Sequence, residues 1–136
     1  MKKLMSTRYG AAAFNFGALG LRVTFGSLMF IEHGLTKLNK FGELENTFAD
    51  PLHIGHKFSL LLVLFSEVVC SLLLILGLLS RLAAFVLFVE MVIIIFMIHR
   101  GQPVSTYEVA VAHVAAYFML LLTGPGRISV DAMSGK

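Results

Sequence analysis

Residues 58–98 read FSLLLVLFSEVVCSLLLILGLLSRLAAFVLFVEMVIIIFMI, and this apolar stretch decides the class of the fold. Its charged residues are Glu67, Arg81 and Glu90. A helix that crosses a bilayer needs about 20 mainly apolar residues, so roughly 40 such residues are too many for one crossing and suit two. The polar pair Ser80-Arg81 lies near the middle of the stretch, which predicts a tight hairpin between two membrane-spanning helices.

The composition of the whole chain agrees with a membrane protein. Apolar residues make up 57% of the 136 residues and charged residues 14%, whereas charged residues are roughly a quarter of an ordinary soluble domain. The one cysteine, Cys70, cannot form a disulfide within the chain, which excludes a disulfide scaffold. We therefore predict one small integral membrane domain that covers residues 1–136, with the lipid bilayer as its surroundings.

Two further apolar runs flank the central stretch, and together they predict four membrane-spanning helices. The three prolines, Pro51, Pro103 and Pro125, fall between or after these runs, where helices are expected to begin or end. The predicted fold is an all-α, antiparallel, up-down-up-down four-helix membrane bundle. The expected spans are residues 16–38, 58–79, 82–98 and 104–123.

Short local signals mark the two ends of the fourth span. The segment Ser105-Thr106-Tyr107-Glu108 fits a capping box, with Ser105 as the N-cap residue and Glu108 three residues later. Gly124-Pro125-Gly126 is expected to end the helix, because proline cannot continue it and the glycines can take positive φ values.

The distribution of Lys and Arg predicts the orientation in the membrane, because cytoplasmic loops carry more of these residues. With both termini inside, six Lys or Arg residues lie on the inner side and three on the outer side, with Lys37 at the boundary. We therefore expect both termini to be cytoplasmic. The net charge of +3 is then interpreted as anchoring to acidic lipid headgroups, and no nucleic-acid partner is predicted.

Four ionisable side chains are predicted to lie inside the bilayer, where each needs a partner or a hydrated site. Glu67, Glu90 and His113 fall near the midpoints of the second, third and fourth expected spans. Arg22 lies about 7 Å from the midpoint of the first span, a distance that an arginine side chain largely covers. We therefore predict that these four groups converge, with Tyr117 on the same helical face as His113.

Two interpretations of this predicted cluster stay open. In the first, Arg22, Glu67 and Glu90 form a structural ion network that sets how the helices pack. In the second, they form a polar pocket that binds a ligand or moves protons, because one arginine cannot neutralise two carboxylates and one of these should keep a proton. His113 is a candidate member of such a proton relay.

Other polar residues carry weaker signals. Glu32, His33 and Lys37 lie near the outer end of the first span, and we expect them to reach water or pair with the long loop that follows. His53-x-x-His56 is a pattern of low specificity, and no metal site is predicted from it. The chain shows no nucleotide-binding loop or other cofactor motif, so no intrinsic cofactor is predicted.

Three segments resemble the DoxX family of small bacterial membrane proteins. They are residues 22–37, RVTFGSLMFIEHGLTK; residues 67–81, EVVCSLLLILGLLSR; and residues 124–131, GPGRISVD. The resemblance implies a four-helix bundle that crosses the bacterial cytoplasmic (inner) membrane several times. The positions that carry the family pattern are Arg22, Gly34, Lys37, Glu67, Arg81, Gly124, Pro125, Gly126, Arg127 and Asp131.

The resemblance also implies a redox neighbourhood, because relatives include a subunit of thiosulfate:quinone oxidoreductase, proteins induced by quinone or catechol stress, and partners of thiol-redox enzymes. The first hypothesis is therefore a membrane redox component that binds a quinone or a similar amphipathic small molecule at the predicted cluster. Electrons would then come from a redox partner subunit. Whether the chain is an enzyme or an accessory subunit of a quinone-linked oxidoreductase stays open, as does a homo-oligomer. The alternatives are a scaffold for a soluble redox enzyme and a small proton-coupled transporter.

The GPGRISVD tail also has a physical interpretation of its own. Arg127 is expected at the level of the inner headgroups, and Asp131 is expected to pair with Arg127 or with Arg81. Such a pair would hold the tail over the cytoplasmic end of the bundle. This pattern favours a structural role for the tail over a catalytic one.

Overall fold

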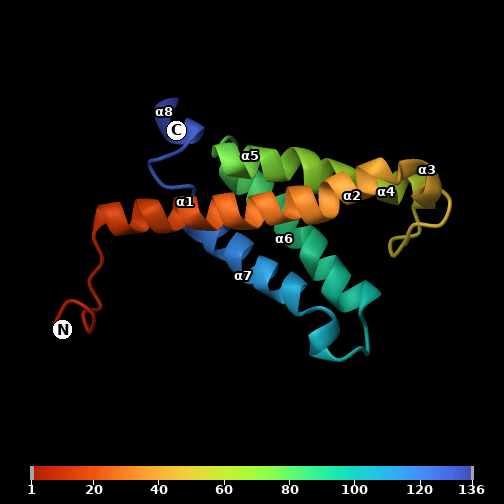
Figure 1. Ribbon diagram of the computed structural model, residues 1–136, viewed down its shortest axis with the longest axis horizontal. Helices are drawn as coiled ribbons and strands as arrows, with labels where there is room; N and C mark the ends of the chain where they lie inside the picture. The colour runs from red at the N-terminus through yellow and green to blue at the C-terminus, as the bar shows by residue number, and fades with distance from the viewer. Residues whose placement is uncertain (1, 136) are drawn as a thin grey trace.

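The computed structural model describes residues 2–135, and within this range the chain forms helices and loops without a β-strand. The predicted all-α class is therefore confirmed. Figure 1 shows that the successive long helices run in opposite directions. Residues 2–10 form a lead-in that projects away from the helices, and the tail after α7 contains a short helix that lies beside α5.

Within residues 2–135, three continuous helices are long and apolar enough to cross a membrane. Each contains a π-helical segment, in which the backbone hydrogen bonds skip one residue more than in an α-helix. The first comprises α1 (Ala11–Leu28), η1 (Met29–Gly34) and α2 (Leu35–Asn39). The second comprises α4 (His56–Leu64), η2 (Phe65–Cys70) and α5 (Ser71–Leu76). The third comprises α6 (Ser80–Ile93) and η3 (Ile94–Ile98).

The remaining helices are shorter. The apolar helix α7 (Glu108–Thr123) has 16 residues and follows a 3₁₀ turn, η4 (Val104–Thr106). A short helix, α3 (Phe41–Leu44), lies in the long loop after α2, and α8 (Val130–Met133) lies in the tail.

The helices pack as two antiparallel pairs that contact each other. The α1–α2 helix lies beside the α4–α5 helix, and α6 lies beside α7 at an angle to the first pair (Figure 1). The buried core between them includes Leu74, Leu87, Tyr117 and Leu120. Large apolar side chains also stay exposed along all four helices, which suits contact with lipid.

The hairpin between the second and third helices lies three residues earlier than the predicted Ser80-Arg81 turn. Helix α5 ends at Leu76, and Ser80 already belongs to α6. Gly77 takes a left-handed conformation (φ 74°), and the Leu78 N–H donates to the Leu73 carbonyl at 2.9 Å, which forms a Schellman helix end. The conformational freedom of Gly77 therefore ends the helix before the polar pair is reached.

The two signals for the fourth helix have different outcomes. The capping-box prediction is wrong, because α7 begins at Glu108 behind Tyr107 and no side chain caps its first turn. The residues around Ser105 form the separate turn η4 instead. The predicted end is confirmed, since α7 stops at Thr123 and Gly124 follows with φ 80°.

Candidate functional site

Arg22 lies buried at one end of the bundle and is 1% exposed. Its Nε donates to the Leu74 carbonyl at 3.0 Å, and its Nη2 donates to the Ile75 carbonyl at 3.1 Å. Its Nη1 donates to the carbonyls of Pro125 and Ile128, both at 2.7 Å. The last carbonyls of a helix lack partners within the helix, and Arg22 supplies such partners for α5. One side chain thus joins α1, α5 and the tail.

This position corrects the predicted convergence of Arg22 with the buried carboxylates. Leu74 lies seven residues beyond Glu67 on the same helix, which corresponds to about 10 Å of rise. The Arg22 guanidinium therefore donates its hydrogen bonds to backbone carbonyls at the end of α5, far from Glu67.

Asp131 attaches the tail to the hairpin. Its two carboxylate oxygens accept hydrogen bonds from the N–H groups of Leu79 and Ser80, both at 2.9 Å, and its own N–H donates to the Gly77 carbonyl at 2.8 Å. The carboxylate therefore serves as an N-cap for α6 from a distant part of the sequence. The two backbone donors are not predicted from the sequence, where the expected partner of Asp131 is an arginine.

The other tail residues reinforce this end of the bundle. The Ser129 hydroxyl donates to the Gly126 carbonyl and accepts from the Ala132 N–H, which caps α8. The Arg127 N–H donates to Asn15 Oδ1 at 3.0 Å, while the Arg127 side chain stays exposed. The GPGRISVD segment is thus tied to the hairpin and to the start of α1.

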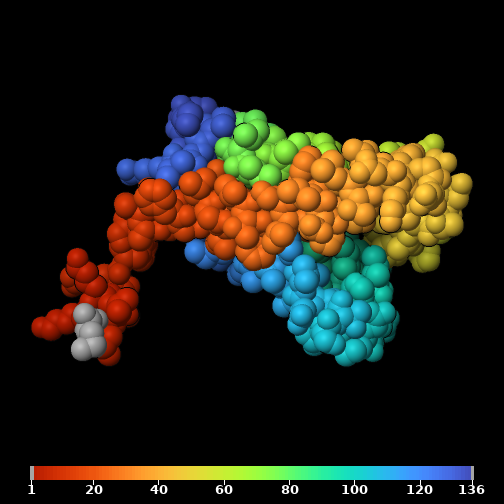
Figure 2. Space-filling model, viewed as in Figure 1, coloured from red at the N-terminus to blue at the C-terminus, as the bar shows by residue number. Residues whose placement is uncertain are grey.

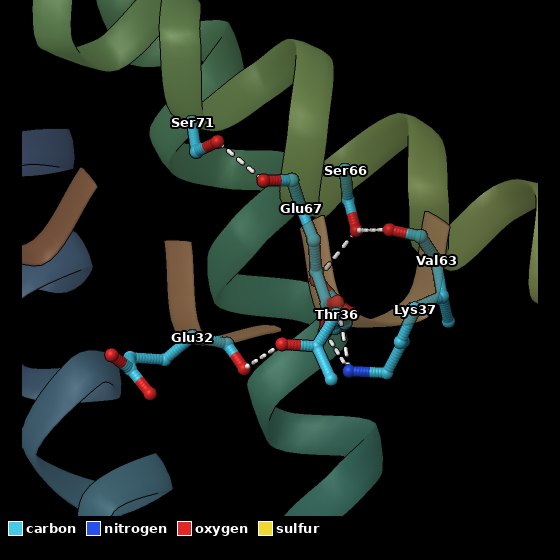
Figure 3. Close-up of polar contacts among 8 residues, drawn as sticks. Glu32, Thr36, Lys37, Val63, Ser66, Glu67 and Ser71 are labelled. Atoms are coloured by element: carbon cyan, nitrogen blue, oxygen red, sulfur yellow. Dashed lines mark hydrogen bonds and ion pairs between the residues drawn. The ribbon is translucent and has the colours of Figure 1, made fainter. Parts of the chain in front are cut away.

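Glu67 has Lys37 as its partner in place of Arg22. The Lys37 ammonium lies 2.8 Å from Glu67 Oε2 and 3.1 Å from Oε1. Figure 3 shows the lysine reaching from the first helix to the carboxylate on the second. The Glu67 side chain is only 2% exposed and that of Lys37 22%. The expectation that Lys37 faces water or the loop is therefore wrong.

Gly34 explains why these two helices meet in this register. A Cβ atom at Gly34 would lie 2.8 Å from the Glu67 carbonyl oxygen, so only glycine lets η1 approach η2 so closely. Lys37 follows Gly34 by three residues and thus lies on the same helical face. The close approach places the lysine ammonium next to the buried carboxylate.

Glu90 of α6 extends this polar group. The Ser66 hydroxyl lies 3.0 Å from the Val63 carbonyl oxygen, a contact seen in Figure 3. It also lies 2.5 Å from Glu90 Oε2, and one hydroxyl proton can serve only one of these two acceptors at a time. Glu90 also lies close enough to Glu67 for the two carboxyl groups to interact electrostatically. The predicted convergence of the two buried glutamates is therefore what the structure shows.

His113 and Tyr117 of α7 complete the group. His113 is 2% exposed, and its Nδ1 lies 2.8 Å from the Val109 carbonyl oxygen. Its ring centre lies 5.7 Å from that of Tyr117 and 6.2 Å from that of His33. Tyr117 is fully buried and interacts electrostatically with both glutamates. We call the following residues the mid-bundle cluster: Lys37, Ser66, Glu67, Glu90, His113 and Tyr117.

Three buried polar atoms of the mid-bundle cluster have no hydrogen-bond partner within the described residues. They are Glu90 Oε1, His113 Nε2 and the Tyr117 hydroxyl oxygen. Leaving such an atom unpaired costs about 1–3 kcal/mol, so their accumulation in one place is typical of a site that exchanges protons or binds a polar group.

Two π-helical segments lie beside the mid-bundle cluster. Segment η2 contains the cluster members Ser66 and Glu67, and η1, which contains His33, packs against η2. Single π-helical turns occur frequently at functional sites, because the extra residue shifts side chains out of the ordinary helical register. The local backbone thus marks the same place as the polar side chains.

Four members of the cluster are predicted from the sequence and brought together by the structure: Glu67, Glu90, His113 and Tyr117. Lys37 is not predicted as a member, and Ser66 is not predicted at all. The available signal was Gly34, because a glycine one helical turn before a lysine indicates a face that can approach a neighbouring helix.

The comparison with known proteins agrees with the resemblance in the sequence. Residues 17–100 match the family model described as DoxX, which is more than half of the 136 residues. The matched range contains Arg22, Lys37, Glu67 and Glu90, whereas α7 and the tail lie beyond it. No curated protein and no solved structure matches the chain.

Proposed function

The chain belongs to the DoxX family, and on that premise we propose that it is a membrane redox component. The mid-bundle cluster binds a quinone or a similar amphipathic small molecule. The chain carries no recognisable cofactor motif, so electrons reach the bound molecule from a partner subunit. The setting that we propose is the bacterial cytoplasmic membrane, crossed four times.

The three unpartnered polar atoms are the observation that carries this proposal. A quinone carbonyl accepts a hydrogen bond, which the buried Tyr117 hydroxyl can donate. The proton of His113 Nδ1 faces the Val109 carbonyl, so Nε2 of the neutral ring is an acceptor, suited to the hydroxyl of the reduced quinol. Apolar side chains such as Phe25, whose ring centre lies 5.0 Å from that of His113, suit the ring of an amphipathic molecule.

The charges of the mid-bundle cluster support proton exchange with the bound molecule. Lys37 offsets the charge of one carboxylate, while Glu67 and Glu90 lie close enough to interact electrostatically. A proton held by one of the two glutamates would complete the charge balance, and Tyr117 lies near both. Reduction of a quinone consumes protons, and this pair is a buried source of one.

The fourth crossing belongs to the proposal. Helix α7 spans about 24 Å, which is shorter than the roughly 30 Å of a hydrocarbon core. The turn η4 before it and the extended segment from Gly124 lengthen the path. With four crossings both termini lie on one side, and the excess of Lys and Arg there favours the cytoplasm.

Ligand-dependent stabilisation tests the proposed function. Purified protein in neutral detergent is heated with and without decylubiquinone, and we expect the quinone to raise the melting temperature, because a ligand that binds only the folded state stabilises it. Tyr117→Phe and Glu90→Gln are expected to remove most of this increase. Ser80→Ala is the matched control, since it removes another buried unpartnered hydroxyl at the far end of the bundle. Equal stabilisation of all four proteins would contradict the proposal.

The scaffold function has one observation in its favour. Arg22 and Asp131 make hydrogen bonds to backbone groups of the hairpin and the tail, which gives the bundle a rigid end. A soluble redox enzyme that co-purifies with the chain, and a quinone that leaves the melting temperature unchanged, would together favour this function.

A further inference from the structure

A second feature, far from the mid-bundle cluster, lies at the end of the molecule where the tail meets the hairpin. There the structure contains a cleft of about 810 Å³. In Figure 2 the blue tail and the first turns of α1 lie side by side at this end, and the red lead-in projects from it. The polar residues that line the cleft are Tyr9, Asn15, Ser80, Arg81, Thr123, Arg127 and Asp131.

The cleft is positively charged. Arg81 and Arg127 both line it with exposed side chains. The Arg81 guanidinium lies against the backbone at Gly124, where a Cβ atom would be 3.3 Å from Nη2, so the α7 end positions it. Asp131 is the acidic residue in the lining, and its two oxygens already accept the N–H groups of Leu79 and Ser80.

Ser80 adds a buried hydroxyl to this charged cleft. The residue is 2% exposed, it lines the cleft, and its Oγ has no hydrogen-bond partner within residues 2–135. It is the first residue of α6, which continues through η3 for 19 residues in all. Asp131 already takes the N–H groups at the start of α6, so the attraction for an anion comes from the two arginines, beside which the Ser80 hydroxyl is an available donor.

An apolar groove continues from the cleft along the helices. It has a volume of about 520 Å³, lies between α1 and α7, and shares Tyr9, Phe14 and Thr123 with the cleft. Its other lining residues are apolar or glycine, namely Ala13, Gly17, Ala18, Leu21, Met119 and Leu120. The charged cleft at the helix ends thus opens into the apolar groove that runs along the helices. Together they match the shape of an amphiphile with an anionic head.

We propose that the cleft and the groove together bind an anionic phospholipid. The phosphate lies between Arg81 and Arg127 and accepts the Ser80 hydroxyl proton, because guanidinium groups bind phosphate through paired, charge-assisted hydrogen bonds. One acyl chain lies in the groove between α1 and α7. The bound lipid joins the hairpin, the tail and the start of α1 at one membrane surface.

Melting temperatures of delipidated full-length protein test this site. The probes are dioleoyl phosphatidylglycerol, dioleoyl phosphatidylcholine and glycerol 1-phosphate, added separately in neutral detergent. We expect phosphatidylglycerol to stabilise the protein at the lowest concentration. Arg81→Gln with Arg127→Gln is expected to weaken its apparent affinity by a factor of ten or more, given the usual strength of hydrogen bonds to charged groups. Arg100→Gln, at the other end of the bundle, is the control and is expected to behave as wild type.

A second pair of variants tests the acyl-chain groove without altering charge. Gly17 lines the groove, Gly20 does not, and a Cβ atom at either position meets nothing within 4 Å. We expect Gly17→Leu to weaken phosphatidylglycerol binding and Gly20→Leu to leave it unchanged. Unchanged lipid affinity in both the double arginine variant and Gly17→Leu would overturn the proposal. Full stabilisation by glycerol 1-phosphate alone would also overturn it, since the site would then be one for free phosphate.

Discussion

Lys37 and Arg22 are the two cations that the first helix places among buried groups, and they have different partners. Arg22 binds four backbone carbonyls, which fits a planar group with several fixed donors. Lys37 binds one carboxylate, which fits a compact ammonium. The arginine at position 22 and the lysine at position 37 thus each suit the arrangement of the oxygen atoms that they bind.

Loss of the Lys37 ammonium is expected to destabilise the protein strongly. Lys37→Met leaves the buried Glu67 carboxylate without its cation, and breaking a buried ion pair on one side typically costs about 3–5 kcal/mol. The free energy of unfolding in mixed micelles measures this effect. The double variant Lys37→Met with Glu67→Gln is expected to recover part of the loss, because the uncompensated charge is removed.

A matched control for this prediction is the exposed pair of Lys57 and Glu45. Their charged atoms are 3.9 Å apart, and the Lys57 side chain is 64% exposed. Lys57→Met is expected to change the unfolding free energy little, because exposed ion pairs are screened by water. A similar loss for Lys37→Met and Lys57→Met would show that Glu67 does not depend on its partner.

At the scale of elements, Gly34 determines how closely η1 and η2 pack. Gly34→Ala places a methyl group 2.8 Å from a backbone oxygen of Glu67, which can move only with its helix. We expect a loss of about 1–3 kcal/mol in unfolding free energy, as for other overpacked contacts. Gly20→Ala, where the methyl group meets nothing within 4 Å, is expected to be neutral or slightly stabilising. If Gly34→Ala were as stable as Gly20→Ala, the close helix contact would be refuted.

Asp50 closes the long loop onto the start of α4. Its carboxylate accepts hydrogen bonds from the N–H groups of Ile54 and Gly55 and from the Ser59 hydroxyl, at 2.8–2.9 Å. Desolvation acts to raise the pKa of this carboxyl, but the three hydrogen bonds and nearby His56 outweigh it and hold the pKa of Asp50 below its usual value of 3.8. The ionised form therefore stabilises the loop end.

The sign of the resulting pH dependence follows from this lowered pKa. The loop contribution is fully present above pH 3.8 and is lost as the pH falls through the lower pKa of the folded state. Amide hydrogen exchange at Ile54 and Gly55 is expected to accelerate, beyond its intrinsic pH dependence, only in that acidic range. Asp50→Asn is expected to show fast exchange at every pH, and a wild-type-like profile in that variant would contradict the prediction.

At the scale of the whole molecule, the proposed four crossings predict that both termini lie on the same side of the membrane. Ser6→Cys and Ser134→Cys are expected to react with a membrane-impermeant maleimide from one side of oriented vesicles, and Gly101→Cys from the other. Native Cys70 is buried and contributes little background. Opposite reactivity of the two terminal positions would indicate that α7 does not cross.

The mid-bundle cluster shows how far the sequence could predict a site inside this membrane protein. Glu67, Glu90 and His113 were predictable, because ionisable residues within apolar runs are rare and costly in a bilayer. The partner of Glu67 was not predictable, because the midpoint of a span gives the depth of a residue only if every helix is centred at the same level in the bilayer. The first helix runs from Ala11 to Asn39, 29 residues, and it is displaced so that Gly34, not Arg22, lies opposite Glu67.

The helical membrane class, the long apolar helices and the glycine that ends α7 follow from the amino-acid sequence, since these depend on local composition and on the cost of transferring residues into lipid. Which polar groups meet between the helices depends on how the helices pack. Sliding one apolar helix along another changes neither its composition nor its period, so the register depends on packing. Here the close contact at Gly34 brings Lys37 to Glu67, and the same register brings Arg22 to the tail.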